Sequence, residues 1–264
     1  MKSCLLSLAI AAIWTSFLSN PLYSISIICG FSLIAVALVF TLERNYSLTG
    51  TIYITAAASL LSKCLTLLIL IHLLGFNPLI ITPENITQGL NKILYLAKLS
   101  GIATQDIQPL STVIPTALRT VNYLLPAGFV IAAFVDSLAN YALVAKISTY
   151  IGKPIKTLPR FEQIRIPMYI AWLFVGSSLT MTYLPGNSHS YFAVASFNIY
   201  IFSLFALIVQ AISGVFCLAN KTAYPLIIKN IAVILIISNP IFSKLAALFA
   251  IYYISRYLRR SKLL

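Results

Sequence analysis

Two charged residues lie inside long apolar stretches of the sequence, where a charge needs a partner. Lys63 is near the middle of the apolar segment 49–75, and Asp136 is near the middle of segment 120–150. A charge at the centre of a membrane helix costs about 2.5–3.5 kcal/mol on insertion scales. If both segments span a bilayer in succession they run in opposite directions, which places the two charges at similar depth. We therefore predict that Lys63 and Asp136 pair within the protein.

Polar residues accompany both charges at helical spacing. Thr55, Ser59 and Lys63 share one helix face, and Asp136 and Asn140 form an i, i+4 pair. Small and polar faces pack against other helices or line cavities. Two interpretations are open: an ion pair that fixes packing, and a pair that lines a substrate or ion path.

Four further polar residues lie in other apolar segments. Asn198 and Gln210, in segment 190–219, complete the candidate intramembrane polar site, although interhelical hydrogen bonding is the commoner role of such residues. Lys229 and Lys244 lie close to helix ends, so their amino groups can reach the membrane surface.

Residues for catalysis or metal binding do not gather anywhere in the sequence. Apart from Asp136, the carboxylates stand in or beside connections, and general acid–base catalysis needs converging titratable groups. The four cysteines are isolated, and two lone histidines do not make a metal site. Nucleotide-binding and hydrolase motifs do not occur. We expect no enzyme, no cofactor and no metal.

The composition requires these residues to be positioned by membrane helices. Of the 264 residues, 60% are hydrophobic and 9% are charged, against roughly 25% charged in soluble domains. Lipid leaves only helices or closed barrels as spanning structures, and barrel strands alternate polar with apolar residues. The uncharged runs 25–42 and 197–219 favour helices. The chain is predicted to be an all-α integral membrane protein with a single transmembrane domain over residues 1–264.

A spanning helix needs about 20 apolar residues, and eight segments approach that length. Residues 1–18 begin like a signal peptide, with Lys2 before an apolar run, but no cleavage site of small residues follows. A retained first helix is therefore expected. The eight predicted helices are 3–18, 21–42, 49–75, 120–150, 167–184, 190–219, 224–238 and 240–256.

The positive residues orient these helices. Cytoplasmic loops of membrane proteins are rich in Lys and Arg, and the connection 152–167 carries four such residues against Glu162. The C-terminal tail is basic too. Dividing 224–256 at Asn239-Pro240, where proline disfavours helix, places both basic segments inside. The prediction is about eight helices in a bacterial plasma membrane, with both termini cytoplasmic.

The net charge of +13 indicates that the protein contacts a negatively charged partner. The cations lie at the ends of apolar segments rather than on a soluble domain, so we expect an anionic lipid bilayer and no nucleic acid as partner. The basic connection is also a candidate docking loop for another protein, through Lys153, Lys156, Arg160 and Arg165.

The longest connection, residues 76–119, is expected outside the membrane. Thr82-Pro83-Glu84 reads as a helix start, and apolar residues then recur at helical spacing up to Gly101. This predicts an amphipathic helix at the outer surface. Segment 108–118 is apolar but holds Pro109 and Pro115, and could re-enter the membrane.

Several segments together resemble a known family. The resemblance lies at five places: the stretch LPRFEQIRIP at 158–167, the stretches LLPA at 124–127 and NYAL at 140–143, Gln210 with Gly214, and the basic end 256–260. At these places the chain is similar to the YybS-like proteins. These are uncharacterised bacterial multi-pass membrane proteins with about eight helices. Ile164 stands where that family has tryptophan, and the family's acid near the C-terminal helix end is missing.

The resemblance implies a second, looser one. YybS-like proteins are similar in architecture to the substrate-binding S components of energy-coupling-factor transporters, which bind a small molecule and dock on a membrane partner through small residues of the first helix. Ser7, Ala11 and Thr15 would serve here.

Two functions follow as hypotheses. A transport-related, small-molecule-binding protein predicts a polar-lined cavity of at least about 300 Å³ in the outer half of the bundle, involving the candidate polar site and closed by 76–119. A non-transporting scaffold that binds partner proteins of envelope biogenesis predicts a filled interior.

Overall fold

The computed structural model describes residues 21–73, 108–183 and 191–261. They belong to two compact units, Met1–Val144 and Ala145–Leu264, and each unit is described by itself. The predicted first helix (3–18) and the predicted outer helix (82–101) lie outside the described residues. The described residues form helices, turns and irregular connections, with no β-strand among them.

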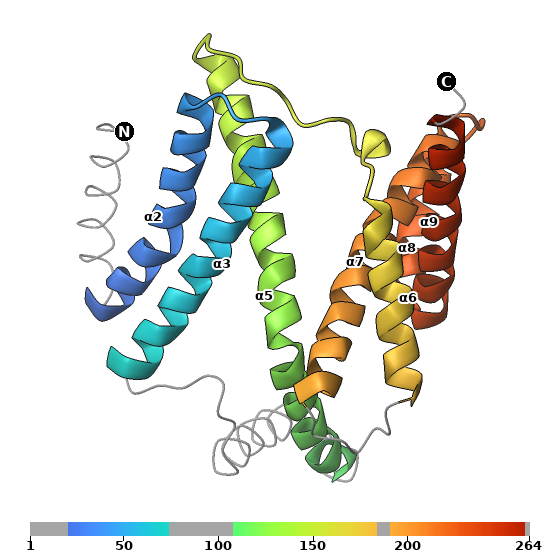
Figure 1. The fold of residues 1–264 in the computed structure, drawn as a ribbon, viewed down its shortest axis with the longest axis horizontal. Coiled ribbons are helices and arrows are strands. Elements are labelled where there is room, and N and C mark those ends of the chain that lie inside the picture. Colours follow the sequence, from blue (N-terminus) through green and yellow to red (C-terminus); the bar gives the residue numbers. More distant parts are fainter. Residues whose placement is uncertain (1–20, 74–107, 184–190, 262–264) are drawn as a thin grey trace, which may run out of the picture. The chain divides into compact units, whose positions relative to one another are not determined.

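Two neighbouring helices and most of a third make up the described part of the first unit (Figure 1). They are α2 (Pro21–Glu43), α3 (Leu48–Leu73) and α5 (Gln108–Tyr150), whose last residues belong to the second unit. A tight turn joins α2 to α3, and Asn45 has a positive φ of 53° there. Asn is among the few residues that adopt this left-handed conformation readily. The turn lays α2 and α3 side by side.

Helix α5 begins twelve residues earlier than predicted. The sequence pattern started this helix at 120 and left 108–118 as a possible re-entrant segment, but the helix runs unbroken from Gln108 to Tyr150. Pro109 occupies the first turn, where a missing N–H leaves no bond unmade. Pro115 and Pro126 lie further along, and membrane helices tolerate such interior prolines. The prolines therefore do not interrupt the helix.

The described part of the second unit holds the end of α5, four packed helices and a short 3₁₀ turn. The turn η2 (Phe161–Gln163) precedes α6 (Met168–Tyr183), α7 (Tyr191–Ala219), α8 (Pro225–Ser238) and α9 (Pro240–Ser261). Helix α7 packs against α6, α8, α9 and η2. It is the central helix of this unit (Figure 1).

The predicted break at Asn239-Pro240 is confirmed. Asn239 is extended, with φ −130° and ψ 122°, and its Oδ1 accepts a hydrogen bond from Ile241 N at 2.8 Å. The residue before a proline avoids the helical region, so the chain turns by 115° between α8 and α9.

Close helix packing in the second unit depends on small residues. Ala246, Ala247 and Ala250 of α9 are buried. On α7, a Cβ added at Gly214 would lie 3.1 Å from Phe249 Cε1. Small residues let membrane helices approach each other closely. Gly214 therefore lets α9 pack closely against α7. This explains the glycine at this position, one of the two on α7 that resemble the YybS-like family.

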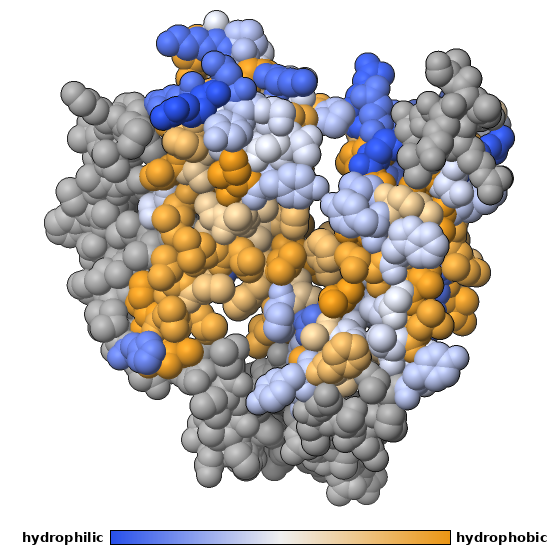
Figure 2. All heavy atoms as spheres, viewed as in Figure 1, coloured by the Kyte–Doolittle hydropathy of each residue, from blue (hydrophilic) through white to orange (hydrophobic). Residues whose placement is uncertain are grey.

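The helices carry apolar side chains on their outer faces. Figure 2 shows apolar spheres along the middles of the helices and hydrophilic spheres toward the helix ends. Large side chains such as Trp172, Leu143 and Ile237 are more than half exposed. Exposure on this scale is typical of a surface that meets lipid rather than water.

Length and composition identify three candidate membrane spans among the described residues, Leu48–His72, Tyr123–Tyr150 and Tyr191–Ala219. The bent pair α8–α9 is a fourth if it counts as one span. The structure thus supports the all-helical membrane class with three or four spans.

Candidate functional site

Lys63 and Asp136 form an ion pair in the first unit, as their sequence positions predict. Lys63 Nζ donates to Asp136 Oδ2 and also to Ser59 Oγ, at 2.9 Å. Ser59 Oγ donates in turn to Asp136 Oδ2, at 3.1 Å. The charges on α3 and α5 are therefore joined directly and through a hydroxyl.

A row of hydroxyls continues this contact along the two helices. Thr55 and Ser137 hydrogen-bond each other through their hydroxyls, and Ser137 Oγ donates to Ile52 O at 2.9 Å. Thr51, Thr55, Ser59 and Ser137 are buried. The spacing of four residues on α3 places these groups on the face toward α5. The cluster joins two helices and neutralises its own charges.

The two candidate asparagines bond to their own helices. Asn140 Nδ2 donates to Asp136 O at 2.8 Å, and Asn198 Nδ2 donates to Val194 O at 2.8 Å. Asn140 belongs to the first unit and Asn198 to the second. These contacts lie within each helix and do not bring the residues of the candidate site together.

Gln210 fixes the basic connection to α7. Its side chain is fully buried, and its Oε1 accepts a hydrogen bond from Ile166 N at 2.7 Å. Ser213, less than one turn further, donates to Ile164 O at 3.3 Å. Asn198 lies twelve residues away on the same helix, roughly 18 Å along its axis. Gln210 therefore serves the connection rather than a site shared with Asn198.

Glu162 holds the same connection to α8. Lys229 Nζ donates to Glu162 Oε1 at 3.1 Å and lies 5.1 Å from the centroid of the Phe216 ring. Phe161 packs on that ring, with 5.4 Å between centroids. Hydrogen bonds from Asn220 and then from Lys229 lower the pKa of the Glu162 carboxyl below its ordinary value. Lys229, expected to reach the membrane surface, pairs with this acid of the connection.

The four basic residues of the connection point outward. Lys153, Lys156, Arg160 and Arg165 are all exposed. The Arg165 guanidinium carbon lies 5.4 Å from the centroid of the Tyr253 ring on α9. Glu162 is the one acid among residues 145–264, and Lys229 engages it. The connection therefore presents four exposed cations on an anchored backbone.

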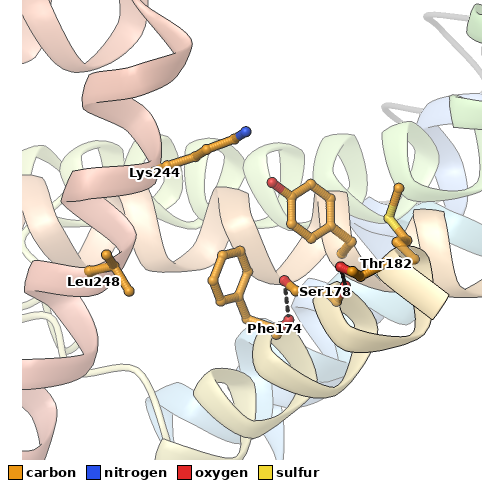
Figure 3. Close-up of a pocket in the computed structure, with 7 residues that line it drawn as sticks. Phe174, Ser178, Thr182, Lys244 and Leu248 are labelled. Carbon is orange, nitrogen blue, oxygen red and sulfur yellow. Dashed lines mark hydrogen bonds between the residues drawn. The ribbon is translucent and has the colours of Figure 1, made fainter.

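An open cleft of about 510 Å³ lies between α6, α7 and α9 in the second unit. Figure 3 shows Lys244 and Leu248 on α9 opposite Phe174, Ser178 and Thr182 on α6. The remaining lining residues are Met181 and Tyr200. The wall therefore combines a cation, three hydroxyl groups and apolar side chains.

None of the five residues predicted for an intramembrane site lines this cleft. Its polar residues come from three helices, and their adjacency does not follow from spacing along the chain. A partial signal existed: Ser178 and Thr182 are one helical turn apart, and Lys244 stands in an apolar segment. The described residues contain no group of three or more His, Cys, Asp or Glu that could hold a metal ion.

Comparison with known proteins agrees with a helical membrane protein. The profile of the family described as "Predicted membrane protein (DUF2232)" matches residues 1–252. The chain belongs to this family. YybS of Bacillus subtilis (strain 168), named as an uncharacterized protein, is 25% identical over 183 residues. That match covers 69% of this chain and 59% of YybS, so the chain spans somewhat more than half of its relative. No solved structure matches the chain.

The family resemblance rests on residues that the structure explains. Phe161 and Glu162, from the LPRFEQIRIP stretch, attach the connection to α7 and α8. Gln210 accepts the backbone N–H of Ile166 in the same stretch, and Gly214 admits α9. In this chain, these residues fix the connection between α5 and α6 onto α7 and α8, and let α9 pack against α7. The likeness to energy-coupling-factor S components is not shown by these comparisons.

Proposed function

We propose that this membrane protein binds a small molecule in the cleft between α6, α7 and α9, in a transport-related role like that of a substrate-binding component. The cleft is the observation that supports it. Its volume of about 510 Å³ falls in the range of 300–1,000 Å³ that ligand pockets occupy. Four polar side chains converge on it from three helices, which suits recognition rather than packing alone.

The proposed topology has about eight helices in the bacterial plasma membrane, with both termini and the connection 152–167 in the cytoplasm. Lys and Arg in the connection support this orientation. Under it, the cleft lies toward the outer end of α6, because Thr182 is next to the last residue of that helix. Helix α8, with 14 residues, rises roughly 21 Å. It is shorter than the hydrocarbon core of about 30 Å, so α8 and α9 would form a hairpin whose first arm is short.

The ion pair of the first unit is assigned a structural role in this proposal. Lys63 and Asp136 satisfy each other and share Ser59. We propose that binding, rather than catalysis, is the activity of the protein, and that no cofactor takes part.

The basic connection is a proposed docking surface for a membrane or cytoplasmic partner. Its anchoring by Gln210, Ser213 and Lys229 supports this role, because a fixed backbone presents its cations in one arrangement. Reversing the charge at Lys156 and Arg160 is then expected to remove a co-purifying partner protein without changing topology. Unaltered complexes would end the docking proposal.

Gentle detergent purification with mass spectrometry tests the binding function. The Ser178→Phe variant fills the cleft, and Leu179→Phe places the same side chain at the neighbouring exposed position of α6. We expect at least one small molecule to accompany the wild type and Leu179→Phe and to be depleted about tenfold in Ser178→Phe, a loss of about 1.4 kcal/mol in binding. Equal small-molecule content in all three proteins would contradict the proposal. Recovery of partner proteins alone would favour the scaffold function.

A further inference from the structure

We propose that the cleft binds a small anion, a carboxylate or a phosphate carried on an apolar body, with Lys244 as its counter-ion. This inference rests on the proposed binding function and names the chemical class of the ligand. It follows from the charges, the hydrogen-bonding groups and the apolar surfaces that meet in the cleft.

The charge on Lys244 is paired with none of the residues that the structure describes. Among the described residues, Lys244 makes no hydrogen bond and no ion pair, and its side chain extends from α9 into the cleft (Figure 3). Residues 145–264 contain a single acid, Glu162, and Lys229 engages it. No described residue of this unit is therefore left to supply a counter-charge to Lys244. An anionic ligand would supply it within the cleft.

The hydroxyl groups of the cleft divide into acceptors and a donor. Ser178 Oγ donates to Phe174 O at 2.7 Å, and Thr182 Oγ1 donates to Ser178 O at 2.9 Å. Each hydroxyl hydrogen is thereby used, and each oxygen keeps lone pairs that can accept. The Tyr200 hydroxyl makes no hydrogen bond among the described residues, so it can donate to the ligand. Lys244 and Tyr200 suit an anion, while Ser178 and Thr182 suit an N–H or O–H group.

Apolar side chains form the rest of the wall. The rings of Phe174 and Tyr200 are stacked, with centroids 5.4 Å apart and planes at 23°. Leu248 and Met181 complete the lining. A thioether adapts to irregular shapes and packs well beside aromatic groups. The ligand is thus expected to have an apolar or ring-shaped part beside its anionic group.

An anionic group on an apolar body occurs both in soluble organic acids and in phospholipids. The probes must separate these sources. Hydrocinnamate represents the soluble acid, and hydrocinnamamide has the same shape without the charge. Short-chain phosphatidylglycerol represents the anionic lipid, with phosphatidylcholine of the same chain length as its control.

The experiment measures the Kd of each probe for the full chain in an uncharged detergent. It uses the wild type, Lys244→Gln, Lys244→Arg, and Lys221→Gln, which removes an exposed cation outside the cleft. Hydrocinnamate is expected to bind about tenfold more tightly than its amide, a difference of about 1.4 kcal/mol. This preference should persist in Lys244→Arg and Lys221→Gln and disappear in Lys244→Gln. If Lys244→Gln fails to give a monodisperse protein, the acid-against-amide comparison in the wild type and Lys244→Arg decides.

Each other outcome has a definite meaning. Equal affinity for the acid and the amide overturns the anion inference and leaves the binding function standing. Binding of phosphatidylglycerol alone, dependent on Lys244, keeps the anion site but assigns it to lipid, which counts against the small-molecule function. If no probe binds, the inference is wrong, and the binding function is decided separately by co-purification with Ser178→Phe.

Discussion

The charge of Lys63 is held by two oxygen atoms, Asp136 Oδ2 and Ser59 Oγ, within the row of polar side chains between α3 and α5. The side chains of Lys63 and Asp136 keep 25% and 40% of their exposure. Removing either partner leaves a charge whose other contacts cannot neutralise it. Because the pair is only half-buried, its loss costs less than that of a fully buried pair.

A double-mutant cycle measures this pairing. Lys63→Ala and Asp136→Ala are each expected to lower the free energy of unfolding by about 1–3 kcal/mol, and the double variant by about 1 kcal/mol less than their sum. Denaturant titration in detergent checks this, together with the amount of protein in the membrane. Asn140→Ala combined with Lys63→Ala is the matched control and should be additive. Additivity in the Lys63–Asp136 cycle would show that the pair does not stabilise the fold.

Sequence reasoning works for residues whose own chemistry dictates the kind of partner they need. Lys63 and Asp136 could be paired in advance, because a mid-membrane charge must find an opposite one. Lys244 could not be assigned in this way, because its position near a helix end also fits an amino group that reaches the membrane surface. Its role in the cleft depends on the packing of α6, α7 and α9 around it, and residue spacing along the sequence does not predict that packing.

At the scale of elements, the connection before α6 is the feature that depends most on tertiary contacts. Its basic composition predicted a cytoplasmic loop, but not its attachment. Gln210 and Ser213 bind its backbone, and Glu162 meets Lys229. The break between α8 and α9 was predictable, because proline acts on the residue before it. The early start of α5 was not predictable, because the sequence does not distinguish a proline in the first turn of a helix from one inside it.

The attachment through Glu162 is expected to depend on pH. Asn220 and Lys229 lower the pKa of this carboxyl, so the native state binds its proton less readily than the unfolded chain does. The stabilisation is therefore fully present above the ordinary carboxyl pKa, near 4, and is lost as the pH falls through the lowered value. Wild type and Glu162→Gln should differ in thermal unfolding midpoint at neutral pH and converge in acid.

The control for this pH dependence is Gln163→Ala, at a neighbouring exposed position of η2. Its difference from the wild type should not change with pH. A Glu162→Gln difference that persists below the lowered pKa would show that the contact does not depend on the carboxylate charge.

At the scale of the whole chain, composition decides the class. A mean hydropathy of +0.95 and 9% charged residues cannot cover a water-facing surface, and the exposed apolar side chains of the helices agree with this. Composition does not decide how many of the eight predicted segments cross the bilayer. Crossing depends on helix length and bending, as the 14-residue α8 and its 115° turn into α9 illustrate.

Sidedness is the property that links the basic connection to the cleft. If residues 152–167 are cytoplasmic, the Thr182 end of α6 faces outward, and a ligand would enter the cleft from outside. The four native cysteines can be replaced by alanine, so that one introduced thiol reports on each end of this helix.

Thiol labelling in intact cells tests the account most directly. A membrane-impermeant reagent is applied to the cysteine-free protein carrying either Ser178→Cys in the cleft or Thr157→Cys in the connection. We predict that the thiol at 178 reacts from outside and is protected by a bound ligand, whereas the thiol at 157 reacts only after the membrane is permeabilised. A thiol at 178 that reacts only after permeabilisation, or never reacts, would contradict an outward-opening binding cleft.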